Sequence, residues 1–349
     1  MRAQSETKRS VGRRPIDWIL QNVDLRSSNA AEFWFDRMPS QSGWSLPVIH
    51  CPFDGTKRGH FVDRGRILDF AITAGPGRVL DFGPGDGWPS LLIAPRVTEV
   101  VGVEGSRRRV ETCARNADKL GVANARFVHV PPGRNLPFDN AEFDAVVAAS
   151  SVEQTPDPKA TLAELARVLK PGGRLRISYE SLGYYHGRRE REIALSGENQ
   201  GPTCMLVFDR HVGEECVHHY GLVLDLSRTD VTGLFARHGA DPAYEALSEE
   251  VLEALWGHVT DAATWTTRHP SGSTLVRWLR DAGFTLVRPT RSGRKFAATL
   301  FESLAEAERP VEMEAVDARL RPGLEQAVRV EADAVAPPGE WDPMITAVR

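Results

Sequence analysis

The stretch that decides the fold is RVLDFGPGDG, residues 78–87, in which a short apolar strand runs into an acidic residue and three alternating glycines. Gly83, Gly85 and Gly87 permit tight turns and positive φ angles, and they let the backbone come close to a ligand. A helix that follows such a loop points its first N–H groups at the same place. The stretch therefore predicts a nucleotide-type ligand site, with an ordinary strand-to-helix turn as the alternative.

The spacing of the glycines narrows the class of ligand. The dinucleotide fingerprint G-x-G-x-x-G would need glycine where this chain has Trp88, which disfavours NAD and FAD. The loop also lacks the lysine of a phosphate-binding P-loop.

The segments around this loop alternate between apolar runs and helical patterns. Besides the strand in the quoted stretch, we expect strands at 99–104, 126–130, 143–150, 173–180 and 284–289, and in the last residues, DPMITAVR. We expect helices at 61–74, 88–94, 107–120, 158–169 and 273–282. This alternation predicts an α/β, Rossmann-like, doubly wound sheet of seven mostly parallel strands. The C-terminal strand is expected at a sheet edge.

Composition shifts divide the chain into five parts. Residues 1–14 form a polar, disordered tail; 15–60 an aromatic-rich N-terminal helical cover; 61–180 the ligand-binding core; 181–270 an insertion after the fifth strand; and 271–349 the rest of the core with a helical insertion. The insertion has no clean period, although 218–226 reads as a strand and 241–259 as a helix. We interpret it as a lid over the substrate.

The bulk properties favour a soluble, cytoplasmic enzyme of small molecules. The chain has 349 residues and a net charge of −4, from 43 Lys+Arg and 47 Asp+Glu, so it lacks the overall basic character of nucleic-acid binders. No apolar run is long enough to span a membrane. The four cysteines form no C-x-x-C pair, as expected for reduced thiols.

Ligands of doubly wound sheets bind beyond the carboxyl ends of the strands, so the residues that follow each strand are the site candidates. Asp81 belongs to the first strand end and Glu104 to the second, about twenty residues beyond Gly83, the interval at which an acid reaches ribose hydroxyls. Two carboxylates would repel phosphate and attract an ammonium or sulfonium group. A cationic nucleoside such as S-adenosylmethionine therefore suits the loop better than NAD.

The chain resembles the class I S-adenosylmethionine-dependent methyltransferases. Four blocks carry the resemblance: VLDFGPGDG (79–87), VVGVEGS (100–106), LPFDNAEFDAVVAASSVEQTPDP (136–158) and LAELARVLKPGGRLRIS (162–178). It covers about residues 62–180 and resumes at LVRWLRDAGFTLVR (275–288).

The resemblance implies roles for particular residues. Asp81, Gly83, Gly85 and Gly87 would hold the methionine part of the donor, and Glu104 the ribose hydroxyls. Residues after the fourth strand, Ser150 among them, would face the methyl group. The chain departs from the family pattern twice, with Pro132 in place of an acid that reads adenine and Glu153-Gln154 in place of a glutamate-histidine pair. Adenine would then be read by backbone near Gly133 and Arg134, or by stacking.

The implied reaction is methyl transfer to a small-molecule acceptor such as a metabolite, a quinone-like compound or a natural product. A base is needed only for a hydroxyl or an acidic carbon acceptor. The candidate bases are Tyr184, Tyr185, His186 and Glu153, followed by His50 and His60. A donor-binding protein without catalysis and a dinucleotide-dependent oxidoreductase remain the alternatives.

Three further expectations concern clusters outside the glycine loop. Arg107, Arg108 and Arg109 are interpreted as a solvated helix face. We predict no metal site, because His211, Cys216, His218 and His219 lack zinc spacing. The acidic helical stretch after Phe301 could pack on a second subunit or on its own sheet, so a homodimer stays open.

Overall fold

The computed structural model describes residues 15–38, 51–179, 190–212, 215–239, 248–331 and 344–349. These residues form two compact units. Described residues within 29–188, 213–217 and 266–349 make up the larger unit, and those within 15–28, 189–212 and 218–265 make up the smaller one. Each unit is considered by itself.

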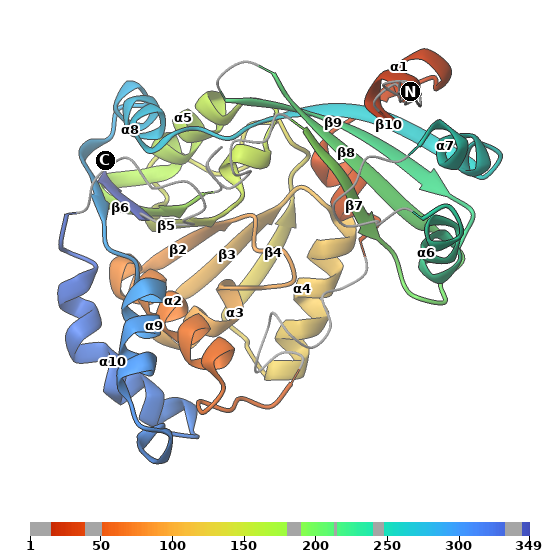
Figure 1. Ribbon diagram of the computed structural model, residues 1–349. Coiled ribbons are helices and arrows are strands. Elements are labelled where there is room, and N and C mark those ends of the chain that lie inside the picture. The colour runs from red at the N-terminus through yellow and green to blue at the C-terminus, as the bar shows by residue number, and fades with distance from the viewer. Residues whose placement is uncertain (1–14, 39–50, 180–189, 213–214, 240–247, 332–343) are drawn as a thin grey trace, which may run out of the picture. The chain divides into compact units, whose positions relative to one another are not determined.

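The described part of the larger unit is built on a seven-stranded sheet with the order β11-β12-β6-β5-β2-β3-β4. Its strands are β2 (Arg78–Phe82), β3 (Glu99–Glu104), β4 (Ala125–His129), β5 (Phe143–Ala149), β6 (Leu169–Ser178), β11 (Thr285–Thr290) and β12 (Met344–Val348). The pairings of β2, β3, β4, β5 and β6 are parallel, and β12 runs antiparallel to β6 and β11. The predicted mostly parallel α/β sheet is confirmed (Figure 1).

Helices cover both faces of this sheet. They are α2 (Arg58–Ala74), α3 (Ser90–Ile93), α4 (Arg107–Leu120), α5 (Pro158–Val168), α8 (Gly272–Asp281), α9 (Gly293–Ser303) and α10 (Met313–Ala327). Short turns of other helix types occur at η1 (Ala30–Phe35), η2 (Ala94–Arg96), η3 (Val152–Gln154) and η5 (Glu306–Glu308). The ends of α4 are as predicted, since the Ser106 hydroxyl caps its first turn and Gly121 ends it in a left-handed conformation.

The core of the larger unit lies on both faces of the sheet. Val79 of β2 packs with Ile67 and Phe70 of α2, while its neighbour Leu80 packs on the other face with Leu162 of α5. Alternate residues of a strand point to opposite faces, so a strand covered on both sides needs apolar residues at nearly every position. This explains why the strands are visible in the sequence as short continuous apolar runs.

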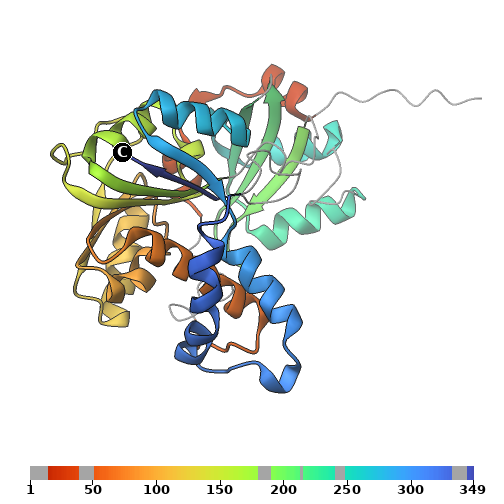
Figure 2. The same ribbon diagram turned by 90° about the vertical axis from the view of Figure 1, so that its left-hand side faces the viewer.

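Three helices pack together beside the sheet. The blue helices α9 and α10 lie beside the orange helix α2 in Figures 1 and 2, and their buried side chains form one apolar cluster. The backbones of α2 and α9 meet at glycines, because a Cβ atom at Gly65 would lie 2.4 Å from the Cβ of Ala297. The helical stretch expected from Phe301 is therefore divided into the end of α9, η5 and α10.

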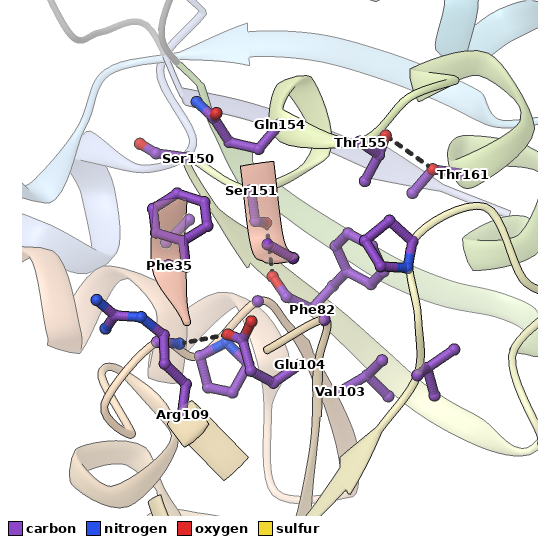
Figure 3. Close-up of a pocket in the computed structure, with 18 of the residues that line it drawn as sticks. Phe35, Phe82, Val103, Glu104, Arg109, Ser150, Ser151, Gln154, Thr155 and Thr161 are labelled. Carbon is purple, nitrogen blue, oxygen red and sulfur yellow. Dashed lines mark hydrogen bonds between the residues drawn. The ribbon is translucent and has the colours of Figure 1, made fainter. Parts of the chain in front are cut away.

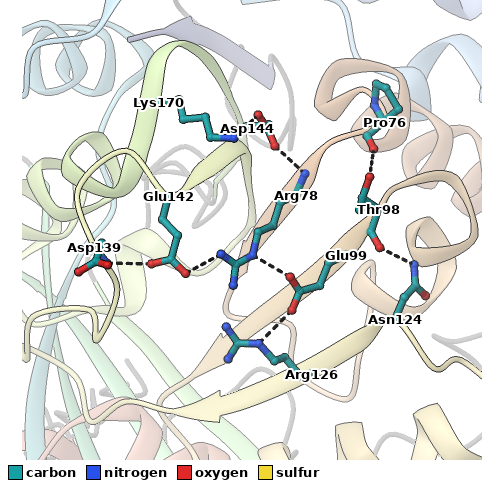
Figure 4. A network of polar contacts seen from close by, with 10 residues as sticks. All are labelled: Pro76, Arg78, Thr98, Glu99, Asn124, Arg126, Asp139, Glu142, Asp144 and Lys170. Atoms are coloured by element: carbon teal, nitrogen blue, oxygen red, sulfur yellow. Dashed lines mark hydrogen bonds and ion pairs between the residues drawn. The ribbon is translucent and has the colours of Figure 1, made fainter.

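Charged side chains at the amino ends of the strands neutralise one another. Arg78 pairs with Glu99 and with Glu142, each at 2.7 Å, and its backbone N–H donates to Asp144. Asp144 in turn pairs with Lys170 at 2.7 Å (Figure 4). These contacts tie the strand starts together, and they hold the pKa of Asp144 below its usual value.

The position of the C-terminal strand differs from the expectation. β12 does not lie at an edge but between β6 and β11, with Ile345 opposite Ile177 and Met344 opposite Thr290. Its side chains Ile345 and Ala347 are fully buried in the core. The C-terminal strand is thus an interior strand of the sheet, because it is hydrogen-bonded to β6 on one side and to β11 on the other.

The smaller unit contains a second sheet, of which the sequence predicted one strand, at 218–226, corresponding to β9 (Cys216–Leu224). Among the described residues its strand order is β1-β10-β9-β8-β7, with bounds β1 (Arg26–Ser27), β7 (Glu190–Ser196), β8 (Cys204–Val212), β9 (Cys216–Leu224) and β10 (Val259–Arg268). Helices α1 (Pro15–Asn22), α6 (Arg228–Arg237) and α7 (Glu249–Trp256) pack on one apolar cluster with its strands. Most side chains of β8 are buried on both faces of the sheet. Its sequence therefore lacks the alternation of apolar and polar residues that marks a strand with one exposed face.

The predicted N-terminal cover at 15–60 is divided by this arrangement. Residues 15–28 belong to the smaller unit, because α1 buries Ile16 and Ile19 in its cluster and β1 pairs with β10. The segment from Asn29 belongs to the larger unit. The role of 181–270 as a lid stays a prediction. No helix in the described ranges is long and apolar enough to cross a membrane.

Candidate functional site

A cavity of about 830 Å³ lies in the larger unit at the carboxyl ends of the central strands. It is lined by the residues that follow four of them: Gly83 to Asp86 after β2, Glu104 and Gly105 at the end of β3, Pro131 to Leu136 after β4, and Ser150 and Ser151 after β5 (Figure 3). The structure thus brings together, at one sheet edge, residues that are far apart in the sequence, as the strand-end argument predicted.

The glycine loop forms one wall of the cavity. Gly83 has a φ angle of 77°, and a Cβ atom there would lie 2.4 Å from the Cβ of Ser151. Gly85, with a φ angle of 60°, also lines the cavity. Gly87 does not line the cavity. It faces α3 instead, where a Cβ atom would lie 2.5 Å from the Leu91 side chain. The first two glycines therefore shape the cavity, and the third allows α3 to pack closely.

Glu104 lies in the cavity wall and is held by backbone groups. Its carboxylate accepts hydrogen bonds from the N–H of Gly85 at 3.0 Å and from the N–H of Ser106 at 3.1 Å. The side chain is buried, and this burial raises its pKa. The carboxylate is therefore fixed in orientation, with lone pairs left to accept hydrogen bonds from a ligand.

Asp81, predicted as a ligand contact, does not line the cavity. Its Oδ2 atom accepts hydrogen bonds from the N–H of Ser90 at 3.1 Å and from the Ser90 hydroxyl at 2.5 Å. Complete burial raises its pKa to about 7. Asp81 thus holds the start of α3 behind the glycine loop, and its predicted contact with the donor stays a prediction.

The residues predicted after the third and fourth strands of the sequence lie in the wall. Gly133 and Arg134 line the cavity, as does Ser150. Ser150 has a φ angle of 52°, which is uncommon for a residue other than glycine, and its buried Oγ atom has no hydrogen-bond partner among the described residues. Functional sites often contain such backbone conformations and unsatisfied buried groups.

Of the predicted bases, Glu153 and His60 lie in the described part of the chain, and neither lines the cavity. Tyr184, Tyr185, His186 and His50 lie outside the described residues. Glu153 is 1% exposed and does not line the cavity, because the turn η3 directs the following residue, Gln154, into the wall instead. His60 also lies away from the cavity wall and accepts a hydrogen bond from the N–H of Asp54 at 3.0 Å.

Charged residues of α2 line the cavity and were not predicted. Asp63 accepts a hydrogen bond from the indole N–H of Trp88 at 3.1 Å, and burial raises its pKa to about 6. Arg66 lies with its guanidinium 4.5 Å from the centre of the Trp88 ring and donates to Ser178. The only sequence signal was the unusual density of charges in a helix that is largely buried, RGHFVDRGR.

Arg109 corrects the interpretation of three arginines as a solvated face. Arg107 and Arg108 are exposed, but Arg109 is 7% exposed and its guanidinium pairs with Asp86 at 2.6 Å. The ring of Phe35, from η1, lies 5.5 Å from the guanidinium carbon. Both residues line the cavity on the same side as Glu104 (Figure 3). A buried cation at a helix start is stabilised because it meets an anion.

Among the histidines considered as metal ligands, His219 pairs with a carboxylate of the smaller unit. His219 is paired through Nδ1 with Asp209 at 2.6 Å and is stacked on Trp265, with 5.0 Å between ring centres. Within the described residues, no three His, Cys, Asp or Glu side chains are grouped so that they could hold a metal ion.

Comparison with known proteins gives a consistent result. Residues 80–177 match the family model described as a methyltransferase domain. The uncharacterized methyltransferase YcgJ of Bacillus subtilis is 34% identical over 112 residues, 32% of this chain and 44% of that protein. The demethylmenaquinone methyltransferase of Thermus thermophilus is 36% identical over 114 residues, 32% of this chain and 51% of that protein.

A longer match extends beyond the central part of the sheet. An uncharacterized methyltransferase of Mycobacterium sp. is 35% identical over 201 residues, which are 57% of this chain and 72% of that protein. In contrast, the chain spans about half the length of the Bacillus and Thermus relatives.

Proposed function

We propose that this chain, which belongs to the class I S-adenosylmethionine-dependent methyltransferases, transfers a methyl group from S-adenosylmethionine to a small-molecule acceptor. The family membership rests on the Mycobacterium relative, of which the chain covers 72% at 35% identity. We further propose the activity, the acceptor and the roles of individual residues.

The cavity fits the donor in charge and in shape. Glu104 offers fixed acceptor oxygens for ribose hydroxyls, and the backbone of Gly83 and Gly85 lines the cavity without a side chain. Asp63 and Arg66 place an anion and a cation in one cavity, as the ammonium and carboxylate of a methionine moiety require. No lysine among the described residues lines the cavity, and Trp88 occupies the position that a dinucleotide fingerprint reserves for glycine.

One observation supports the proposal above the others. The Glu104 carboxylate at the end of β3 is fixed by the backbone of the glycine loop at the end of β2, inside a cavity large enough for a nucleoside and part of a second molecule. The loop and the acid were separate motifs in the sequence, and here they form one binding surface.

S-adenosylmethionine supplies a methyl carbon already activated by its sulfonium group. The chain therefore has to bind the donor and the acceptor, orient them toward each other and exclude water. The Ser151 hydroxyl donates to the carbonyl of Phe82 at 2.6 Å, which fastens the end of β5 to the end of β2. Ser150 and Gln154, which line the cavity beside this hydrogen bond, would then contact the acceptor. A hydroxyl acceptor would additionally need a base, a role for which Tyr184, Tyr185 and His186 stay candidates.

A quinone-like or natural-product acceptor is the narrower part of the proposal. It is supported by the similarity to the Thermus protein, whose name states that it methylates demethylmenaquinone. The cytoplasmic location, the homodimer and the absence of nucleic-acid substrates stay predictions.

The proposal can be tested with a methyl-labelled donor. The purified protein is incubated with labelled S-adenosylmethionine and the small-molecule fraction of a cell extract, and the products are detected by mass spectrometry. We expect a labelled compound together with S-adenosylhomocysteine, and at least tenfold less of both with the Glu104→Ala variant when the donor is limiting. Tight donor binding without a labelled product would identify a non-catalytic binding protein, and binding of NAD instead of the donor would identify an oxidoreductase.

A further inference from the structure

One side of helix α2 carries two arginines into the cavity. Arg58, Val62 and Arg66 follow one another at intervals of four residues, which places them on the same side of the helix, and all three line the cavity. Asp63 lines it as well. Arg58 is exposed and Arg66 is partly exposed, so both residues keep surface that a molecule in the cavity can reach.

A close approach of two helices adds a third arginine. Helix α9 lies beside α2 (Figure 1) and begins at Gly293, where a Cβ atom would lie 2.4 Å from the backbone oxygen of Gly65 in α2. The next residue, Arg294, is exposed and lines the same cavity. Burial raises the pKa of Asp63 to about 6, and the positive charges of Arg66 and Arg294 act against this rise. The start of α9 therefore brings its cation to the charged side of α2.

The arginine wall, defined as Arg58, Arg66 and Arg294, has more cations than acids. Among the described residues of α2 and α9 that line the cavity, Asp63 is the only acid. Arg58 also pairs with Glu302, outside the cavity, at 2.7 Å, but these two side chains are 57% and 61% exposed. Such exposed pairs are weak, so Arg58 can change partners.

Acids in the other walls of the cavity are engaged locally. Asp86 pairs with Arg109 at 2.6 Å, and Glu164 pairs with Arg167 at 2.9 Å. Asp157 accepts hydrogen bonds from N–H groups in the first turn of α5. The acid at the end of β3 is held by the glycine loop. The positive charge of the arginine wall is therefore a local property of α2 and α9.

The arginine wall is anchored on the side of the cavity away from the ribose-binding acid. Arg66 donates a hydrogen bond at 3.0 Å to the hydroxyl of Ser178, at the end of β6. In the sheet, β5 and β6 lie on one side of β2, whereas β3, which ends in Glu104, lies on the other. Ser150, a proposed contact of the acceptor, follows β5. The wall thus lies on the side where we expect the acceptor.

We propose that the acceptor carries an anionic group, a carboxylate or a phosphate monoester, and that Arg58 and Arg294 bind this group. The inference rests on the proposed function and names the class of acceptor. Asp63 and Arg66 match the ammonium and carboxylate of the donor, so the other two cations are left for a second molecule. Guanidinium groups bind carboxylates and phosphates through paired hydrogen bonds. The sulfonium group of the donor attracts an anion further.

An anionic acceptor would be a charged metabolite or natural product rather than a neutral quinone. The test starts from the small-molecule fraction of a cell extract, which is separated on a strong anion exchanger at neutral pH. The retained and the unretained pools are desalted, and each is incubated with the purified protein and methyl-labelled S-adenosylmethionine. We expect the labelled product from the retained pool. When this pool is first treated with alkaline phosphatase, loss of the product identifies a phosphate monoester and its persistence identifies a carboxylate.

Arg294→Gln tests the arginine wall itself. Arg319→Gln, at an exposed position of α10, is the matched control. With a limiting amount of the retained pool, we expect methyl transfer by Arg294→Gln to be at least about tenfold slower than by the control, as the loss of a charge-assisted hydrogen bond predicts. Calorimetry should give both variants the same affinity for S-adenosylhomocysteine, because Arg66 and not Arg294 matches the carboxylate of the donor.

A labelled product formed mainly from the unretained pool would overturn the inference and leave the proposed function intact. Equal rates for Arg294→Gln and Arg319→Gln would also overturn it. So would a loss of S-adenosylhomocysteine affinity in Arg294→Gln as large as its loss of rate, because Arg294 would then bind the donor. Absence of a labelled product from both pools would instead count against the proposed function.

Discussion

The N–H of Gly85 donates a hydrogen bond to the carboxylate of Glu104 at 3.0 Å, and this contact joins the ends of β2 and β3. This hydrogen bond joins the glycine loop and Glu104, because the carboxylate holds the backbone of the loop in place. Because the two strands are adjacent and parallel, with Phe82 opposite Val103, both ends meet at the same edge of the sheet.

Replacement of Glu104 by alanine should weaken both the loop and donor binding. It removes the acceptor of two backbone N–H groups, which should cost about 1–3 kcal/mol of unfolding free energy. Donor affinity measured by calorimetry should fall at least tenfold. Glu111→Ala, at an exposed position of α4, is the matched control and should change neither quantity. Unchanged donor affinity in Glu104→Ala would show that this acid does not bind the ribose.

Gly83→Ala should be more destabilising than Gly133→Ala, although the two positions have nearly the same φ angles, 77° and 79°. Both substitutions strain the backbone to a similar degree, by about 1–2 kcal/mol. At Gly83 the new Cβ atom would also meet the Cβ of Ser151 at 2.4 Å, whereas nothing lies within 4 Å at Gly133. Chemical denaturation of both variants measures the difference. Equal losses would mean that the approach of Ser151 is unimportant.

The stability of the protein should depend on pH through Asp81. Burial raises its pKa in the folded state to about 7 from its usual value of 3.8, so the folded state binds more protons than the unfolded state between these values. The free energy of unfolding contributed by this group therefore falls as pH rises from about 4 to 7, by at most about 1.4 kcal/mol per pH unit. Asp81→Asn removes the titration and can still accept from Ser90.

Denaturation at pH 5, 6, 7 and 8 tests this expectation. The wild type should lose more stability than Asp81→Asn between pH 5 and 7, and the two should approach parallel curves only near pH 8, about one unit above the pKa. Parallel curves over the whole range would show that Asp81 is already ionised at pH 5.

The buried pair of Arg176 and Asp69 should contribute far more to stability than an exposed pair. Arg176 of β6 is fully buried and contacts both carboxylate oxygens of Asp69 at 2.7 Å. Arg176→Met leaves Asp69 buried without its partner, which should cost about 3–5 kcal/mol. Arg126→Met breaks an exposed pair with Glu99 and should cost less than about 1 kcal/mol. Similar unfolding free energies for the two variants would contradict this difference.

The sequence by itself determined the alternation of strands and helices in the larger unit, the glycine loop and the acid at Glu104. These features depend on local rules: buried parallel strands need continuous apolar runs, and tight turns need glycine. Even the ends of α4 were predicted, because Ser106 and Gly121 satisfy the backbone groups that a helix leaves unpaired. Of the second sheet only the strand at 218–226 was predicted, and β8 was missed because it is buried along most of its length and shows no alternation.

Only the tertiary structure decided which side chains reach the cavity. Asp81 and Glu153 are chemically suitable, but strand direction and the turn η3 place both away from the cavity wall. Asp63, Arg66, Phe35 and Arg109 line the cavity because helices and turns distant in the sequence pack at the same sheet edge. Such contacts depend on the packing of whole elements, which no local pattern encodes. The glycine loop marks where the ligand binds, and the packing around it selects the groups that bind it.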